Sequence, residues 1–417
     1  TGPVPGGGPP AVAAALVAAL GEHGVLPERG IGEGRALEEL TRVLTAGSVD
    51  PGHPWCAAHL HGPTLAVAAV ADLMGSVLNP SLDSWDQAPV ASELERELTA
   101  ALARLCFPGA GSPDAVITGG GTESNLVGLL LAREHGRTRV VCGRHAHHSV
   151  ARAAWLLGVP APRVVGAERG RLRADDLDLT GGEVVVATAG TTDTGEIDPL
   201  PELAGAARRA GAWLHVDASY GGALLFSDRL AGRLAGLDQA DSVALDLHKF
   251  GWQPIAAGVL ATRDAITELH TRADYLNAAD DTEAGLPDLL GRSVRTSRRP
   301  DCFKIAVTLR ALGRQGIARL VERCCELARQ LAHEAARHPG LELWGAPELS
   351  TVLVRPVHGD AAAVRRRLLE DGTAVVGRAT VDGRVWLKLT LLHPGASLDD
   401  YRGLLDLVDV TARRTAP

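Results

Sequence analysis

Seven short apolar runs between residues 114 and 262 constrain the fold of this chain more than any other feature. They are rich in Val, Ala and Leu, and stretches with a helical pattern separate several of them. Strands that are apolar along their whole length are typical of parallel sheets covered by helices on both faces. The pattern therefore predicts an α/β domain with a mostly parallel central sheet. The runs are Ala115–Gly121, Arg139–Gly143, Arg163–Glu168, Glu183–Gly190, Ala212–Ser219, Ser242–Leu247 and Ala257–Thr262.

The flanking regions predict two further parts. The region before residue 107 reads mostly as helices, after ten residues rich in Gly and Pro that are predicted to be disordered. Towards the C-terminus, strands at 350–356 and 384–392 flank a helix at 361–372, which predicts a small α+β domain. The predicted division is an N-terminal helical segment at 1–70, a large α/β domain at 71–315 and the α+β domain at 316–417.

Charge and cysteine usage exclude several classes of protein. A net charge of -8 argues against nucleic acid or an anionic membrane as the main partner. Apolar stretches such as Ala11–Leu20 are too short to span a bilayer and follow no basic segment, so neither a signal peptide nor a transmembrane helix is predicted. The six cysteines include no CxxC pair, which favours reduced thiols in a cytoplasmic protein and no metal site.

Lysine is rare in this chain. Only three of the 42 basic residues are lysines, namely Lys249, Lys304 and Lys388. Arginine cannot act as a nucleophile near neutral pH, so a retained lysine is a candidate for amine chemistry. Lys249 ends an apolar run, where an ammonium group is costly to bury. Lys304 lies in a helix-like segment, where its stem is expected to pack and its head to reach water.

A glycine-rich turn follows the first apolar run. In Val116–Arg133, a strand leads into three glycines, a threonine and then an amphipathic helix. Glycines allow backbone amides to approach an anion, and a helix N-terminus supplies free N–H groups. The segment matches neither GxGxxG nor GxxxxGK[ST], so we prefer a phosphate cradle of another kind to a dinucleotide site or a plain turn.

Other polar residues follow neighbouring runs. Asp217 ends an apolar strand, at the edge of an open α/β sheet where ligands bind. Thr191 and Thr192 follow another strand, and Cys142–Gly158 carries three histidines. Those histidines lack further metal ligands nearby, which leaves an imidazole lying against a planar cofactor or a solvated loop histidine. A phosphate cradle, a strand-end carboxylate, an imidazole and a buried amine together indicate pyridoxal 5′-phosphate.

The motifs resemble those of the group II pyridoxal-phosphate-dependent amino acid decarboxylases, in the same order. They are TGGGTESNL, HAHHSV, ATAGTTDTGEIDPL, WLHVDASYGG and DSVALDLHKF. The likeness covers nearly the whole chain, and HPWCAAHLHGPT, NPSLDSWDQAPVASELE and RTSRRPDCFKIAVTLRALG look most similar to the bacterial diaminobutyrate and lysine decarboxylase branch. The resemblance implies the type I, aspartate aminotransferase-like pyridoxal-phosphate fold, and a homodimer with active sites at the subunit interface.

The resemblance also implies roles for residues around the cofactor. Lys249 would be the Schiff-base lysine, Asp217 the partner of the pyridine nitrogen, and His147 the imidazole that stacks on the ring. The remaining implied contacts are Gly121 and Thr122 at the phosphate, with Ser242 or Asp246 as further contacts, Thr191 at the oxygen edge of the ring, and His248 at the reacting face.

On the substrate side, His59 matches an N-terminal contact position of the family, and Lys388 lies where the glutamate branch has a carboxylate-binding arginine. Asp86 is a candidate for the distal ammonium of a diamino acid, with a structural role equally open. Many members carry a tyrosine on a mobile loop that protonates the carbanion. The corresponding segment, Tyr275–Arg298, has no Tyr or His after its first residue, and Leu289 or a neighbour takes that position. The proton donor is then His248 or a water.

These features predict decarboxylation of a small or basic L-amino acid to an amine and CO2. Few aromatic residues disfavour an aromatic substrate. The same cofactor could also support another outcome, such as decarboxylation-dependent oxidative deamination to an aldehyde, or another lyase or transferase reaction. A non-catalytic binding or scaffold protein that retains the fold is a third reading. An NAD-dependent oxidoreductase is disfavoured because no dinucleotide fingerprint follows a strand.

Overall fold

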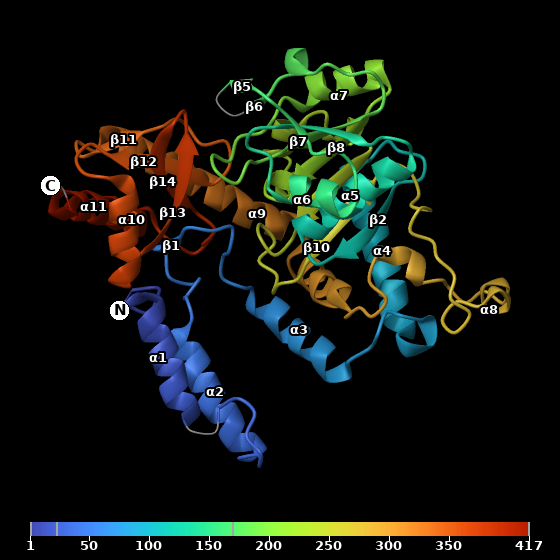
Figure 1. Ribbon diagram of the computed structural model, residues 1–417, viewed down its shortest axis with the longest axis horizontal. Coiled ribbons are helices and arrows are strands. Elements are labelled where there is room, and N and C mark those ends of the chain that lie inside the picture. The colour runs from blue at the N-terminus through green and yellow to red at the C-terminus, as the bar shows by residue number, and fades with distance from the viewer. Residues whose placement is uncertain (1, 22–23, 169–170, 416–417) are drawn as a thin grey trace. The chain divides into compact units, whose positions relative to one another are not determined.

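The computed structural model describes residues 2–21, 24–168 and 171–415 (Figure 1). The chain divides into two compact units, one formed by Thr64–Arg323 and the other by Thr1–Pro63 together with Cys324–Pro417. We describe each unit by itself.

The sheet of the Thr64–Arg323 unit contains all seven apolar runs. Within the described residues its strand order is β2-β10-β9-β8-β7-β3-β4. Five strands, from β9 to β4 in this order, pair in parallel, whereas β10 pairs antiparallel with both β9 and β2. The prediction of a mostly parallel α/β sheet is confirmed, with β10 as the reversed strand. The bounds are β2 Asp114–Thr118, β3 Arg139–Gly143, β4 Arg163–Val165, β7 Glu183–Thr188, β8 Trp213–Ala218, β9 Ser242–Asp246 and β10 Gly258–Thr262.

Helices cover this sheet. Leu129 of α5 and Ala153 of α6 pack in one buried cluster with Val140 of β3 and Val186 of β7. Burial of such aliphatic side chains stabilises the fold by about 1.5–3 kcal/mol each. The helices of this unit are α3 Ala66–Leu78, α4 Pro89–Cys106, α5 Gly121–Glu134, α6 Ser149–Leu156, α7 Leu200–Ala210 and α8 Ala279–Glu283, and a hairpin is formed by β5 Ala167–Glu168 and β6 Arg171–Leu172.

The other unit is built on a smaller sheet. Its order is β1-β13-β14-β12-β11 within the described residues, and β1 pairs in parallel with β13. The helix and both strands predicted near the C-terminus are present as α10, β12 and β14. The bounds are β1 Cys56–Ala57, β11 Leu341–Leu343, β12 Thr351–Pro356, β13 Val375–Val381, β14 Arg384–Thr390, α1 Gly8–Leu20, α2 Glu33–Gly47, α10 Ala361–Glu370 and α11 Leu398–Thr415.

A long helix, α9 Asp301–Arg337, crosses from one unit into the other. It is broken at Gly313, where φ is 63° and ψ is 173°. Glycine tolerates this left-handed φ without the steric penalty that a Cβ would bring.

One sequence expectation differs from the structure. The first ten residues are not all disordered, because α1 begins at Gly8 and the Gly7 N–H donates to the Glu370 carbonyl at 2.8 Å. The compact units join the residues before 64 with those after 323, because β1 adds to the C-terminal sheet. The division of the chain at 70/71 and 315/316 stays a prediction.

Candidate functional site

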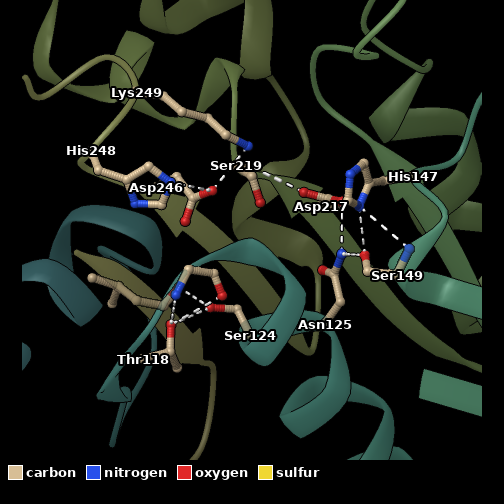
Figure 2. A network of polar contacts seen from close by, with 12 residues as sticks. Thr118, Ser124, Asn125, His147, Ser149, Asp217, Ser219, Asp246, His248 and Lys249 are labelled. Carbon is tan, nitrogen blue, oxygen red and sulfur yellow. Dashed lines mark hydrogen bonds and ion pairs between the residues drawn. The ribbon is translucent and has the colours of Figure 1, made fainter. Parts of the chain in front are cut away.

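The candidate site lies at the carboxyl ends of β8 and β9. Asp217 is paired with Ala244 in the parallel register of these two strands. Lys249 follows the end of β9 by three residues. Because carboxyl ends of parallel strands meet at one edge of a sheet, the carboxylate and the amine come from the edge where open α/β sheets bind ligands. Figure 2 shows both side chains in this network.

The Lys249 amine is held by a carboxylate. Its Nζ lies 2.9 Å from Asp246 Oδ2, whereas His248 Nε2 lies 3.5 Å from the same oxygen. Burial lowers the pKa of His248, against the opposing charge of Asp246. His248 therefore prefers its neutral form, in which one ring nitrogen can accept a proton and the other can donate one.

The glycine turn lies against these residues. A Cβ on Gly121 would be 2.2 Å from Ser219 Oγ and 3.1 Å from Asp246 Oδ2, and one on Gly120 would be 3.0 Å from His248 Cε1. Gly120 also has a φ of 149°, which few other residues adopt. The backbone of the turn and the N-terminus of α5 therefore approach the site more closely than any residue with a side chain would allow.

Hydroxyl groups on both sides of the glycine turn in the sequence hold it in place. Thr118 Oγ1 and Ser124 Oγ lie 2.7 Å apart, and the Ser124 hydroxyl donates to the Val259 carbonyl at 3.1 Å. Thr122, one of the predicted phosphate contacts, is exposed at the start of α5. This arrangement fixes the glycine backbone in position for an anionic group.

Asp217 is buried and remains ionised. Burial alone raises its pKa, but the Lys249 charge and hydrogen bonds from Asn125 and Ser219 hold the pKa below its ordinary value. Asn125 Nδ2 donates to Asp217 Oδ2 at 2.8 Å, and the Ser219 N–H donates to Oδ1 at 3.1 Å. A carboxylate that accepts several hydrogen bonds favours its charged form.

His147 lies on the turn before α6. Its Nδ1 is 2.8 Å from Ser149 Oγ, and the Ser149 hydroxyl also accepts from Asn125 Nδ2 at 2.9 Å. Burial lowers the pKa of His147, although the Asp217 charge opposes the effect. A single amide, that of Asn125, therefore contacts both Asp217 and Ser149, the hydrogen-bond partner of His147 (Figure 2).

These residues fit the cofactor that the sequence indicated. The glycine turn brings its backbone and the N-terminus of α5 to the site, which suits a phosphate, and Asp217 presents an ionised carboxylate suited to a protonated pyridine nitrogen. Asp246 Oδ1 is buried and has no hydrogen-bond partner among the described residues, so this pocket has polar capacity left for a ligand.

Thr191 and Ser242, two further predicted cofactor contacts, lie at opposite ends of their strands. Thr191 follows the end of β7, is buried, and bonds to Thr194 Oγ1 at 2.7 Å. Ser242 begins β9, at the opposite end of the strand from Lys249. It bonds to His215 Nδ1 at 2.8 Å and accepts from Trp213 Nε1 at 3.1 Å. The structure does not bring Ser242 together with the glycine turn, because the strand separates them.

The predicted substrate contacts come from other parts of the chain. His59 and Lys388 belong to the other compact unit, where burial and the Lys388 charge lower the pKa of His59. Asp86 lines a pocket of about 400 Å³ with Tyr275 and Asp281. No hydrogen bond among the described residues links Asp86 to the Lys249 network. Their roles stay predictions.

The segment Tyr275–Arg298, which lacks a second tyrosine, has an exposed start and a buried middle. Tyr275 is exposed at its start, whereas Leu289 is buried. Arg292 fixes the following turn through two hydrogen bonds of 2.8 Å to the Asp114 carboxylate. An aliphatic side chain at Leu289 cannot donate a proton, which keeps His248 or a water as candidates.

The expectation for Lys304 was wrong. Its head does not reach water, since the side chain is 1% exposed and Nζ lies 3.0 Å from both Asp72 Oδ1 and Asp301 Oδ1. The two carboxylates offset the free-energy cost of burying the ammonium. The helical pattern around Lys304 alone did not reveal these two partners.

Sequence reasoning assigned no role to Asn125, Ser149 or His215. Each lies inside a quoted motif, and His215 precedes Asp217 by two residues, which places both on one face of β8. That spacing was the available signal. Among the described residues, no cluster of three metal-binding side chains is present, and no helix is long and apolar enough to span a membrane.

Comparison with known proteins gives consistent results. The family model for the pyridoxal-dependent decarboxylase conserved domain matches residues 26–355. An L-2,4-diaminobutyrate decarboxylase of Rhizobium meliloti (strain 1021) is 41% identical over 419 residues, covering 93% of this chain and 84% of that protein. An enzyme of the same name from Acinetobacter baumannii is 32% identical over 436 residues, covering 93% and 85%.

Among solved structures, one similar chain is the glutamate decarboxylase domain of the diaminobutyrate-pyruvate transaminase and L-2,4-diaminobutyrate decarboxylase from Vibrio parahaemolyticus. It has a TM-score of 0.84 at 28% identity and covers 99% of this chain and 91% of its own.

Proposed function

Because this chain belongs to the pyridoxal-dependent decarboxylase family, we propose that it removes the α-carboxyl group of a small L-diamino acid, with L-2,4-diaminobutyrate as the first candidate. The family membership confirms the sequence predictions of a type I pyridoxal-phosphate fold, of pyridoxal 5′-phosphate as cofactor, and of an amino acid decarboxylase. The observation that carries the site proposal is the placement of an ionised Asp217 and the Lys249 amine at one sheet edge.

When bound, pyridoxal 5′-phosphate supplies an aldehyde for an amine and a ring that withdraws electrons from the substrate α-carbon. Lys249 Nζ would hold the aldehyde, and the backbone of Gly121 and Thr122 would hold the phosphate. Asp217 would keep a proton on the ring nitrogen, since its own pKa is held low. His147 would lie against the ring, and Thr191 at its oxygen edge.

The proton that replaces the carboxylate needs a donor. His248 carries a ring whose Nε2 lies 3.5 Å from Asp246 Oδ2, the carboxylate partner of Lys249, and the charge of Asp246 favours the protonated ring that a proton donor needs. We propose His248, directly or through a water, for this role. The absence of a second Tyr from the Tyr275–Arg298 segment favours it over a loop residue.

The names of the relatives support a diamino acid substrate. Such a substrate carries a distal ammonium, for which a carboxylate is the expected partner. Asp86 is the proposed partner, with His59 and Lys388 as further substrate contacts. Lys388 is suited to the substrate carboxylate rather than to its ammonium, because like charges repel.

We also infer a homodimer. α1 and α2 bury none of their own residues, although α1 is mostly Ala, Val and Leu. On α3, five large apolar side chains are exposed, namely Val70, Leu73, Met74, Val77 and Leu78. Apolar helix faces of this extent mark association surfaces, and a second copy of the chain is the proposed occupant.

Six free cysteines, five of them buried, fit a reducing compartment such as the cytoplasm.

The test is an assay of the purified chain, supplied with pyridoxal 5′-phosphate, on a panel of diamino, acidic, aromatic and small neutral L-amino acids. Release of CO2 with the matching amine from L-2,4-diaminobutyrate is the expected result. Aldehyde, ammonia and hydrogen peroxide are measured in parallel, and their formation without amine would replace simple decarboxylation by the oxidative outcome.

Variants test the residues. Lys249→Ala is expected to lose the visible absorbance of the covalently bound cofactor, and Asp217→Asn to keep the cofactor but lower kcat about 100- to 1,000-fold. The matched control is Asp228→Asn, whose side chain is 86% exposed. Wild-type turnover in Asp217→Asn would remove the proposed role of this carboxylate.

A further inference from the structure

A chain of buried polar groups reaches Asp217 from the far end of the sheet. It begins at the Trp213 indole and passes through Ser242, His215 and Asn125, with distances of 3.1, 2.8, 2.9 and 2.8 Å. Three of its links, Ser242, His215 and Asn125, have an exposed fraction of zero. Because the Asn125 amide and the His215 imidazole are fully buried, their polar atoms must form hydrogen bonds with other members of this chain of groups.

The amide of Asn125 has one possible orientation. Both of its N–H groups are used, one on Asp217 Oδ2 and the other on Ser149 Oγ. Its Oδ1 faces His215 Nε2 at 2.9 Å. Turning the amide over would place its carbonyl oxygen against the Asp217 carboxylate, where two acceptors repel each other.

The imidazole of His215 is consequently fixed in one tautomer. Its Nε2 must carry the proton, because Asn125 Oδ1 can only accept. Complete burial lowers the pKa of His215 to about 4, so the ring is neutral and Nδ1 is a bare acceptor. The Ser242 hydroxyl then donates to Nδ1 and accepts the Trp213 N–H. Every hydrogen in the chain therefore points towards Asp217.

The backbone makes room for this arrangement. Trp213, His215 and Asp217 alternate along β8, so all three side chains project from one face of the strand. A Cβ on Gly128 of α5 would lie 2.6 Å from His215 Cε1 and Nδ1. Helix α5 therefore carries a glycine where the imidazole packs, one turn after the asparagine that the imidazole contacts.

From this geometry we infer that Asn125 and His215 are positioning residues that hold Asp217 ionised and His147 in a single tautomer. The inference rests on the proposed role of Asp217 towards the cofactor. A carboxylate that receives only donors stays charged and keeps its remaining lone pair for the ring nitrogen. Through Ser149, the same amide directs a hydroxyl hydrogen at His147 Nδ1, which leaves the proton of His147 on Nε2.

The first experiment reads the tautomer directly and needs no turnover. The full chain, deuterated and labelled with 15N-histidine, is studied by NMR with and without pyridoxal 5′-phosphate. We expect His215 to be neutral and protonated at Nε2 at pH 7 in both samples. A ring protonated at Nδ1, or at both nitrogens, overturns the inference.

The second experiment compares three variants. His215→Leu removes the donor to Asn125, and we expect kcat to fall about tenfold with KM unchanged. His215→Gln keeps an N–H near the former Nε2 and is expected to restore most of the rate. Asn125→Asp puts a second carboxylate beside Asp217 and is expected to weaken cofactor binding most at high pH, where both are ionised.

The matched control is His333→Leu, the same substitution at an exposed position on α9, which is expected to change neither parameter. Equal loss in His215→Leu and His215→Gln would reduce His215 to a packing residue. Failure of the proposed function is recognised separately, by wild-type turnover in Asp217→Asn or Lys249→Ala, and the NMR result is independent of both.

Discussion

Lys249 Nζ lies 2.9 Å from Asp246 Oδ2, three residues earlier on the same strand end. Asp246 entered the sequence analysis as a candidate phosphate contact, yet its carboxylate is occupied with the amine. The Asp246 carboxylate and a phosphate group are both negative and would repel each other at close range. Asp246 is therefore better suited to orient the Lys249 side chain than to bind phosphate. The glycine turn then remains as the proposed anion-binding element of the site.

Gly121→Ala is expected to weaken binding of pyridoxal 5′-phosphate. The added Cβ would lie 2.2 Å from Ser219 Oγ, and the displacement it forces costs about 1–3 kcal/mol in overpacked sites. Titration of the apoprotein with the cofactor, followed by fluorescence, gives the dissociation constant. Gly34→Ala in α2, where a Cβ meets nothing within 4 Å, is the control and should bind normally. Equal affinities in the two variants would contradict the close approach.

Lys304→Met is expected to lower the free energy of unfolding by about 3–5 kcal/mol, because Asp72 and Asp301 lose their buried cation. Urea denaturation followed by circular dichroism measures the change. Arg329→Met, on the same helix α9 but with its side chain 68% exposed, is expected to leave the free energy of unfolding nearly unchanged. If Lys304→Met were as stable as the wild type, the ammonium would be solvated as the sequence first suggested.

His215 makes the stability of the protein depend on pH. Its folded pKa is about 4 and its ordinary value 6.5, so the unfolded chain binds the extra proton between these values. Stability from this residue is complete above pH 6.5 and is lost as the pH falls towards 4, by about 2–4 kcal/mol in total.

His215→Gln has no titrating ring and is expected to show a shallower fall over that range. Because burial also lowers the pKa of His59, His147 and His248, the readout is the difference between wild type and variant in unfolding free energy at several pH values. Parallel curves for the two proteins would exclude a buried neutral imidazole at this position.

The exposed face of α3 tests the homodimer. The double substitution Leu73→Glu/Val77→Glu places charges on two side chains that are 62% and 69% exposed. We expect the protein to sediment as a monomer, since burying unpaired charges in an interface is unfavourable. Val410→Glu, at another exposed apolar position on α11, is expected to leave the dimer intact. A dimer in both variants would move the interface away from α3.

Much of the large unit was predictable because its signals are local. The seven apolar runs became the seven strands of one sheet, since continuous hydrophobic stretches bounded by turns have few other solutions. The reversed direction of β10 was not predictable from its own residues. The direction of a strand depends on how the intervening chain crosses the sheet. An apolar run has the same residue pattern whether its strand is parallel or antiparallel to its neighbours.

The site, too, contains residues that could be recognised from local sequence and residues whose positions depend on the fold. Lys249, Asp217 and the glycine turn could be recognised because their chemistry is rare at strand ends and their order is characteristic. Ser242 was predicted as a phosphate contact from the family resemblance. The strand β9 carries it to the opposite end of the sheet, because an extended chain rises about 3.3 Å per residue.

The sequence by itself determined the class of sheet and the cofactor, and it yielded Lys249 and Asp217 as the proposed amine and carboxylate, since these depend on residue types and local pattern. Only the tertiary structure decided which side chains share a buried environment. Asn125 and His215 are 90 residues apart, as the sequence numbers show, and meet because α5 packs on β8. Lys304 is neutralised by Asp72 from another helix. Burial turns such remote contacts into strong constraints, because a polar group that has left water must find its partner within the fold.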